Sequence, residues 1–181
     1  GVSIDGLKLK DYSLMYGSNI GLTVSSDGEV TKPKNPAFRV GLNGNVTVAA
    51  NNFIKFNDTT GGVGACNIGE PSGHYDTTTG LFTAPIGGFY WFTMIALLQN
   101  VSDGENFADV FRFKVNSTLM QYSWKRAEYV SGTTGNSSYY SDFMSMGVEL
   151  SANDTVGVVV TSEQTVHGNK EFTTFQGFLV G

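Results

Sequence analysis

The stretch GHYDTTTGLFTAPIGGFYWF, residues 73–92, decides the fold because it joins two strand patterns through two different turns. The turn at 76–80 is predicted to close a hairpin, since Gly80 has no Cβ and adopts a positive φ without strain. The Pro-Ile-Gly-Gly sequence at 85–88 is expected to end strand pairing and to let the chain cross to a second sheet. A chain built around this join contains two β-sheets that lie face to face.

Alternating apolar and polar residues extend the strand pattern over most of the chain. Tyr90 and Phe92 share one face of their strand and are predicted to fill the core. Alternation groups further side chains on one face of their strands: Phe111, Phe113 and Val115, then Val156, Val158 and Val160, then Phe175, Gly177 and Leu179, which lie opposite Phe172, Thr174, Gln176 and Phe178. The run Phe89–Leu98 is apolar throughout, which predicts a central strand buried on both faces. Asn116–Tyr129 has a weak helical period but no cap, and we predict strand there too.

Polar turns rich in Asn, Gly and Asp separate these strands, and the whole pattern predicts an all-β sandwich of the jelly-roll kind. Composition agrees with a self-sufficient domain, because a chain of 181 residues buries roughly 70% of its unfolded surface. Cys66 is the only cysteine, so no intrachain disulfide forms, and we expect it to be a small buried apolar residue. The net charge of −5 and the scattered Lys and Arg residues argue against nucleic acid as a partner. The longest apolar run is half the length that spans a bilayer.

A shift in composition near the Pro33 and Pro36 positions divides the chain into residues 1–35 and residues 36–181. Residues 1–35 are short alternating fragments with few large apolar side chains, so they cannot form a core alone. They must lie on the main domain, be disordered, or wind with copies of themselves. We favour the last alternative, which makes residues 1–35 a β-rich shaft or linker segment.

The stretch at 73–92 resembles the signature of the complement C1q globular-head family. The signature residues present here are Gly73, Tyr75, Asp76, Thr79, Gly80, Phe82, Pro85, Gly88, Tyr90 and Phe92. PAFRVGL at 36–42, NFIKFN at 52–57 and VELSANDTVGVVV at 148–160 resemble strands of such heads, in order. TFQGFLVG at 174–181 resembles the closing strand, with Phe175, Gly177 and Phe178 at the matching places.

This resemblance implies a ten-stranded jelly-roll sandwich of C1q/TNF type that assembles as a compact homotrimer. An obligate interface of that kind buries more than about 2,000 Å². Three heads present three copies of each loop, so weak contacts at single sites gain strength through multivalency. The implied function is recognition without chemistry.

The sequence contains none of the common catalytic motifs: no G-x-S-x-G, no H-E-x-x-H, no C-x-x-C and no P-loop. His74 and His167 are the only histidines and lack the spacing of a metal site. The acidic loop SDGENFAD offers Asp103, Glu105 and Asp109 as calcium ligands, and heads of this family often bind calcium near the trimer apex. A solvated acidic turn is the alternative and the one we favour, so no cofactor is expected unless calcium binds there.

Candidate ligand contacts are Tyr139 and Tyr140, as aromatic platforms for sugar rings, with Lys125 and Arg126 as anion contacts. For each, a strand-end aromatic or a solvated charge is the competing interpretation. Six sequons occur, at Asn45, Asn57, Asn100, Asn116, Asn136 and Asn153. They are glycan sites in a secreted animal protein, or ordinary turn chemistry, which we favour.

Two biological settings use such a head. The stretch VSSDGEVTKPKNPAF at 24–38 resembles the junction between shaft and C1q-like knob in phage tail fibres. This favours the distal knob of a bacteriophage tail fibre, located at the virion surface and attaching to host carbohydrate. The alternative is a secreted, extracellular animal lectin of innate immunity, which the sequon excess favours. In either case the expected partners are copies of the chain itself and a surface carbohydrate or receptor.

Overall fold

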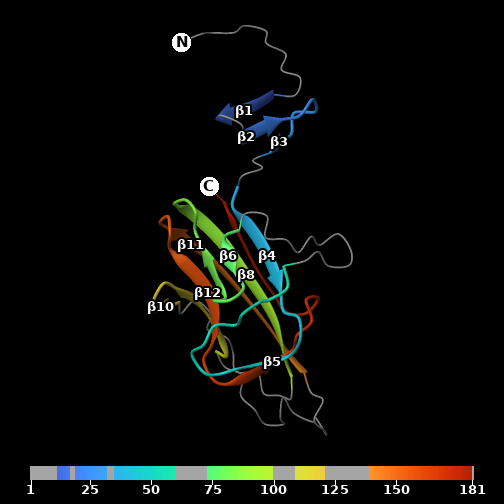
Figure 1. Cartoon of the computed structure of the whole chain (residues 1–181), viewed down its shortest axis with the longest axis vertical. Helices are drawn as coiled ribbons and strands as arrows, with labels where there is room; N and C mark the ends of the chain where they lie inside the picture. Colours follow the sequence, from blue (N-terminus) through green and yellow to red (C-terminus); the bar gives the residue numbers. More distant parts are fainter. Residues whose placement is uncertain are drawn as a thin grey trace. The chain divides into compact units, whose positions relative to one another are not determined.

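The structure is a computed structural model in which the chain divides into two compact units, Gly1–Asn35 and Pro36–Gly181. Figure 1 shows the strands of both units. The residues described are 12–16, 19–31, 35–59, 73–99, 109–120 and 139–180. All secondary structure in these ranges is strand or turn, and no helix in them is long and apolar enough to cross a membrane.

The smaller unit contains an antiparallel three-stranded sheet. Its strands, in order, are β1 (Tyr12–Tyr16), β2 (Asn19–Val24) and β3 (Val30–Thr31). The turn between β2 and β3 is closed by the Ser25 N–H, which donates to the Glu29 carbonyl at 2.8 Å, with Gly28 at a φ of 85°. The short fragments of this region therefore pair with one another, and whether they also wind with copies of the chain stays a prediction.

The first sheet of the larger unit has six strands in the order β4-β14-β8-β13-β5, with β11 paired to the other edge of β8. Its strands are β4 (Ala37–Gly41), β5 (Val46–Val48), β8 (Gly88–Gln99), β11 (Tyr139–Leu150), β13 (Gln164–Val166) and β14 (Thr174–Leu179). β8 and β11 are the longest strands and pair along their whole length, so they form the longest strand pair of this sheet.

The second sheet has five strands in the order β10-β9-β12-β7-β6. Its strands are β6 (Tyr75–Asp76), β7 (Leu81–Thr83), β9 (Phe111–Val115), β10 (Thr118–Leu119) and β12 (Thr155–Val160). Every pairing in both sheets is antiparallel. The all-β jelly-roll sandwich predicted from the sequence is confirmed, with one strand more than the ten that the resemblance implies.

The stretch at 73–92 joins the sheets as predicted, because β6 and β7 belong to one sheet and β8 to the other. The hairpin closes where the Gly80 N–H donates to the Asp76 carbonyl at 2.8 Å, and Gly80 has a φ of 80°. A Cβ at Gly80 would lie 2.7 Å from the Ile54 carbonyl oxygen, so the turn touches a neighbouring segment that only glycine allows.

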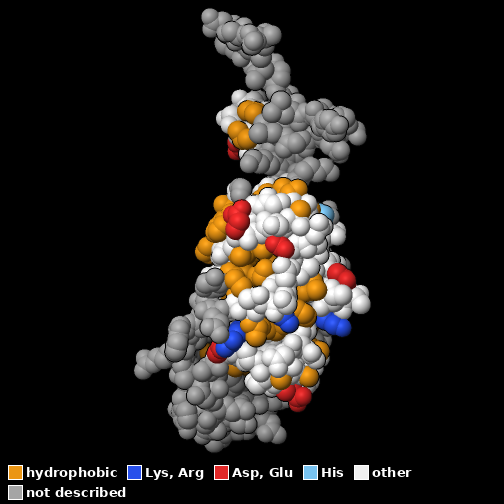
Figure 2. Space-filling model, turned by 90° about the vertical axis from the view of Figure 1, so that its left-hand side faces the viewer, with side chains coloured by type: hydrophobic (Ala, Val, Ile, Leu, Met, Phe, Trp, Pro, Cys, Tyr) orange, Lys and Arg blue, Asp and Glu red, His pale blue; other side chains and the backbone are white. Residues whose placement is uncertain are grey.

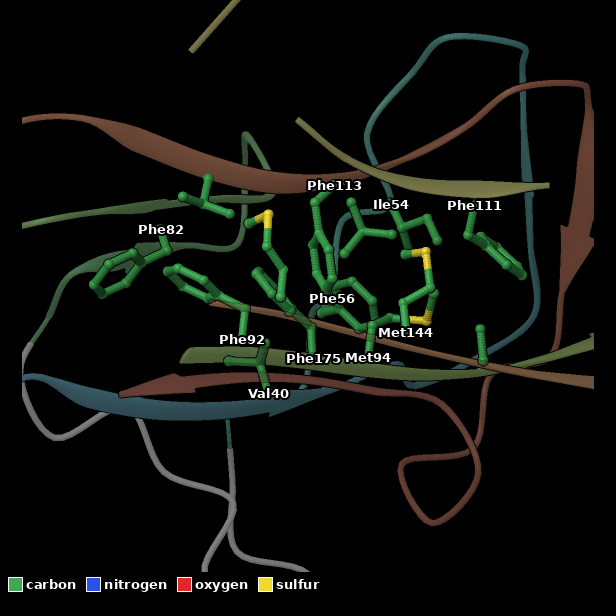
Figure 3. Packing of buried hydrophobic residues seen from close by; sticks show 14 of the residues in the cluster. Val40, Ile54, Phe56, Phe82, Phe92, Met94, Phe111, Phe113, Met144 and Phe175 are labelled. Atoms are coloured by element: carbon green, nitrogen blue, oxygen red, sulfur yellow. The ribbon is translucent and has the colours of Figure 1, made fainter. Parts of the chain in front are cut away.

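Aromatic rings from both sheets fill the space between them (Figure 3). The Phe38 ring lies 4.8 Å from the Phe82 ring and 4.9 Å from the Phe175 ring, centroid to centroid. Phe92 is fully buried beside them, as predicted. A Cβ at Gly177 would lie 2.4 Å from the Phe92 ring, which explains glycine in the middle of β14.

The prediction that Phe89–Leu98 is buried on both faces is wrong for the single chain. Tyr90, Phe92 and the alternate residues up to Leu98 are buried, whereas the side chains between them are exposed or half-buried. The physical reason is that the sandwich has only two layers, so β8 meets the other sheet on one face only. The apolar residues of its second face are left at the surface.

Candidate functional site

The outer side of the six-stranded sheet carries large apolar side chains from three adjacent strands, and we call it the apolar sheet face. Its members, with exposed fractions, are Phe89 (39%), Trp91 (39%), Ile95 (42%), Phe143 (54%) and Phe178 (46%). Exposed large apolar side chains in such number on one sheet mark a surface for protein association or ligand binding.

Strand register lines these residues up in rows across the sheet. Phe178 lies opposite Trp91, and Trp91 lies opposite Gly147 of β11. A Cβ at Gly147 would lie 2.6 Å from the Phe89 ring and 3.0 Å from the Trp91 ring, so both rings cover this glycine. The aromatic surface is therefore formed by the fold itself, with its rings already held in place.

A polar row separates this aromatic end from Ile95 and Phe143. It consists of Arg39, Gln176, Thr93 and Ser145, from four neighbouring strands. The Nε of Arg39 is buried without a hydrogen-bond partner among the described residues. A buried donor that lacks an acceptor costs about 1–3 kcal/mol, so this position favours an acceptor that the described residues do not supply.

Tyr139 and Tyr140, the predicted aromatic contacts, point to opposite sides of β11. Tyr139 is 49% exposed on the apolar sheet face, where its ring meets the His167 ring edge-on at 5.3 Å. Tyr140 packs against the core instead. The structure therefore does not bring these two rings together as one platform, and Lys125 and Arg126 lie outside the described residues.

Of the proposed calcium ligands, Asp103 and Glu105 lie outside the described residues, and Asp109 lies in the turn two residues before β9. The Asp109 carboxylate accepts from the Arg112 Nε at 2.8 Å, and this hydrogen bond raises the pKa of the Arg112 guanidinium. Within the described ranges, no three His, Cys, Asp or Glu side chains gather as metal ligands would. Calcium binding stays a prediction, and Arg112 bonds to one oxygen of the Asp109 carboxylate, Oδ2.

Three of the sequon asparagines support the fold through their side-chain amides. The Asn57 Nδ2 donates to the Asn43 carbonyl at 3.1 Å, and its Oδ1 accepts from the Asn43 N–H. The Asn45 Nδ2 donates to the Gln99 Oε1, and the Asn45 Oδ1 accepts from the Gly168 N–H. The Asn116 Oδ1 accepts from the Thr155 N–H at 2.9 Å.

Asn153 occupies a turn with a φ of 72°, a backbone conformation that asparagine tolerates. Asn100 and Asn136 lie outside the described residues. The structure therefore gives four of the asparagines a local reason to be asparagine.

The signature residues act as fold determinants, and their electrostatics follow from that. The Tyr75 hydroxyl accepts from the Phe56 N–H at 3.1 Å inside the core, and burial raises the pKa of Tyr75 well above its usual value. The Thr78 N–H donates to Asp76 at 2.7 Å and thereby lowers the pKa of that carboxyl. Neither group is placed to act on a substrate.

Sequence reasoning missed two features of the surface. The apolar sheet face was hidden because β8 is apolar on both sides, which removes the alternation that normally marks the outward residues. The segment NFIKFN does alternate: Ile54 and Phe56 are fully buried, whereas Phe53 and Lys55 point outward. That signal was available and identifies Phe53 as an outward aromatic.

Comparison with known proteins gives one family and many solved structures that match this chain. The model of the C1q domain matches residues 37–180. The globular domain of zebrafish complement 1qA is similar at 19% identity with a TM-score of 0.57, covering 82% of this chain and 98% of that one. The Eiger TNF of S. frugiperda is similar at 13% identity with a TM-score of 0.51, covering 81% and 94%. No curated protein sequence is similar enough to count as a match.

Proposed function

This chain belongs to the C1q domain family, and we propose that it is a non-enzymatic homotrimeric head, the distal knob of a bacteriophage tail fibre that attaches to glycans on the host surface. Domains of the C1q and TNF type generally form trimers. In this proposal the larger unit supplies the binding head, and residues 1–35 supply the end of the shaft.

The apolar sheet face is the observation that carries the trimer. Its aromatic residues are too large and too close together to be left in water without reason, because monomers seldom expose a continuous apolar patch of this kind. Packing these residues against two other copies of the chain would bury the apolar side chains that the single chain leaves exposed. Those exposed side chains are the reason why the prediction for Phe89–Leu98 is wrong for the single chain. The strand is then buried on both faces, one by the core and one by the assembly.

Arg39 supports the same arrangement. Its Nε is buried in the polar row between two apolar bands, where water has little access. An acceptor from a neighbouring copy would satisfy this donor, and the position in the row would also fix the orientation of the copies.

The tail-fibre setting is supported by the smaller unit. A three-stranded sheet that precedes the head, without any collagen-like repeat in the sequence, suits a β-structured shaft. The secreted lectin is the second candidate, and the six sequons favour it. That support weakens where the asparagine amides hold turns, as Asn45, Asn57 and Asn116 do.

The proposal is tested by mass and by adsorption. Sedimentation of the full chain at micromolar concentration is expected to give a trimer, and Ile95→Asp is expected to give monomers because it places a charge on the apolar sheet face. Ile86→Asp is the matched control, since Ile86 is similarly exposed (49% against 42% for Ile95) and lies in the crossing loop before β8 rather than in a strand of the six-stranded sheet. A parent chain that sediments as a monomer contradicts the proposal.

Attachment is measured by competition. The trimer should block adsorption of its phage to host cells and should bind a surface polysaccharide on a glycan array, and the Ile95→Asp monomer should do both far less well. The non-enzymatic assignment is contradicted if the trimer binds none of the host polysaccharides on the array and instead turns over some substrate. A trimer that binds microbial glycans but is encoded beside a signal peptide and introns supports the lectin instead.

A further inference from the structure

An open pocket of about 470 Å³ lies beside Phe53, away from the apolar sheet face. We call it the Phe53 pocket, and the lining residues that matter here are Val48, Asn52, Phe53, Lys55 and Thr79. Its volume falls within the range of about 300–1,000 Å³ typical of small-molecule sites. Its lining mixes apolar walls with hydroxyl, amide and ammonium groups, which is the composition of a site for a polar ligand.

The floor of the pocket is held firmly by the backbone. Residues 51–54 continue the five-stranded sheet beside β12: the Ile54 N–H donates to the Val158 carbonyl at 2.8 Å, and Phe53 bridges Val159. Gly157 makes room for the aromatic ring, because a Cβ there would lie 2.7 Å from the Phe53 ring. The backbone of Phe53 is therefore held in place, and its half-buried ring points outward.

The signature turn supplies a second wall. Because Gly80 touches the Ile54 carbonyl, the turn at 76–80 abuts the segment that carries Phe53 and Lys55. This contact brings the exposed Thr79 hydroxyl to the rim of the pocket. Asn52, also exposed, lines the same pocket and offers both an N–H donor and a carbonyl acceptor.

Two ammonium groups give the site its charge. Lys55 lines the pocket, and the Lys114 Nζ lies 5.5 Å from the centre of the Phe53 ring, where the ring attracts and orients it. Neither lysine has an ion pair with a carboxylate among the described residues. Figure 2 shows Lys and Arg side chains on one face of the larger unit, with apolar side chains and some Asp or Glu side chains beside them. In a chain of net charge −5, two lysines without a carboxylate partner among the described residues favour an anionic ligand.

We propose that the Phe53 pocket binds a saccharide unit that carries a carboxylate, such as a uronic acid of a surface polysaccharide. Lys55 and Lys114 meet the carboxylate, Asn52 and Thr79 bond the sugar hydroxyls, and Val48 with the edge of Phe53 contacts the C–H groups of the ring. This inference rests on the proposed attachment to glycans and specifies the class of glycan and the residues that recognise it.

The location of the pocket suits an assembled head. The pocket is lined by β5 and Ala49, by Asn52, Phe53 and Lys55, and by Thr79. None of its described lining residues belongs to β8, β11 or β14, whose side chains form the apolar sheet face. Association through the apolar sheet face therefore leaves three pockets open to a repeating polysaccharide, and binding of several units at once multiplies a weak affinity.

The test is calorimetric titration of the full chain with three probes: trigalacturonate, the neutral trisaccharide maltotriose, and citrate, a carboxylate without a sugar. Trigalacturonate is expected to bind, and maltotriose and citrate at least about 10-fold more weakly. Lys55→Gln and Lys114→Gln are each expected to weaken trigalacturonate binding about 5-fold, the value of one partly exposed charge contact. Lys55→Arg should retain most of the affinity.

Lys170→Gln is the control, because it removes the same charge from a lysine that pairs with Asp58 and does not line the pocket. Thermal melts and sedimentation of every variant exclude loss of fold or trimer as the cause. The proposal is overturned if the parent fails to bind trigalacturonate, if maltotriose binds equally well, or if Lys55→Gln and Lys114→Gln bind like the parent. If the parent adsorbs to host glycans while these variants adsorb equally well, the pocket assignment fails and the attachment function stands. If no glycan is bound at all, the proposed function fails as well.

Discussion

Replacing Gly177 with alanine should destabilise the head strongly, because the added methyl group has no space. Its carbon would lie 2.4 Å from the Phe92 Cδ1, 2.6 Å from the Phe92 Cε1 and 2.9 Å from the Phe38 Cε1. Neither ring can withdraw, since Phe92 is fully buried and lies within about 6 Å of the Phe82 and Phe175 rings. Overpacking of a rigid core costs about 1–3 kcal/mol, and we expect the upper end here.

The same substitution at Gly157 provides the contrast. A methyl group there also meets a ring, 2.7 Å from the Phe53 Cδ1, but Phe53 is only half-buried and can rotate outward. We therefore expect Gly157→Ala to lower the free energy of unfolding by less than about 1 kcal/mol.

For Gly177→Ala, a loss of about 3 kcal/mol corresponds to a fall in Tm of roughly 6–12 °C for a chain of this size.

The assay is urea denaturation at one fixed protein concentration, because the stability of an oligomer depends on concentration. Phe92→Leu in the Gly177→Ala background should recover part of the loss, since the smaller side chain frees the space that the methyl group needs. A Gly177→Ala chain as stable as the parent, or a double variant worse than the sum of the two single changes, would refute the reasoning.

Three further predictions concern hydrogen bonds and charge. Tyr75→Phe should cost about 1–3 kcal/mol in urea denaturation, because it leaves the buried Phe56 N–H without its acceptor; an unchanged midpoint contradicts this. Asn116→Ala should lower the free energy of unfolding by about 1–2 kcal/mol, because it removes the acceptor of the Thr155 N–H and because alanine tolerates the φ of 52° poorly. Thr118→Ala removes only the sequon and should leave the urea midpoint unchanged. If instead Thr118→Ala is as harmful, a glycan rather than the amide is what matters. Asp76 and Asp154 both have lowered pKa values, mainly because the Thr78 N–H donates to Asp76 and the Asn116 side chain donates to Asp154. The stability that these two carboxylates add to the fold is therefore fully present above the ordinary pKa of 3.8 and is lost as the pH falls through their lower pKa values in the folded protein. The Asp76→Ala, Asp154→Ala chain should therefore lose less stability than the parent on acidification, and parallel pH profiles of the two midpoints would contradict this.

Much of the fold could be predicted because its determinants are local. The turn at 76–80, the crossing at 85–88 and the alternation around Phe113 and Phe175 each depend on a few neighbouring residues with a plain steric meaning. Alternation alone grouped Gly177 with Phe175 and Leu179 on one face of their strand. The structure shows that this face is buried and that the missing side chain of Gly177 admits the Phe92 ring.

The surface was harder to predict because its meaning depends on long-range register. Tyr139 and Tyr140 are adjacent in sequence, yet strand geometry sends one to the apolar sheet face and one to the core. Lys114 is far from Phe53 in sequence and reaches its ring only because residues 51–54 and β9 both pair with β12. No pattern along the chain indicates such a contact between distant residues.

The Phe53 pocket and the apolar sheet face are formed by different residues, and this bears on how the sequence of the head can change during evolution. No described lining residue of the Phe53 pocket belongs to the apolar sheet face. In the proposed attachment head, exchanges at Lys55 or Thr79 would therefore change which polysaccharide is bound without altering the proposed contact between subunits. Selection for a new host would act on the pocket residues, and selection for assembly would act on the apolar sheet face.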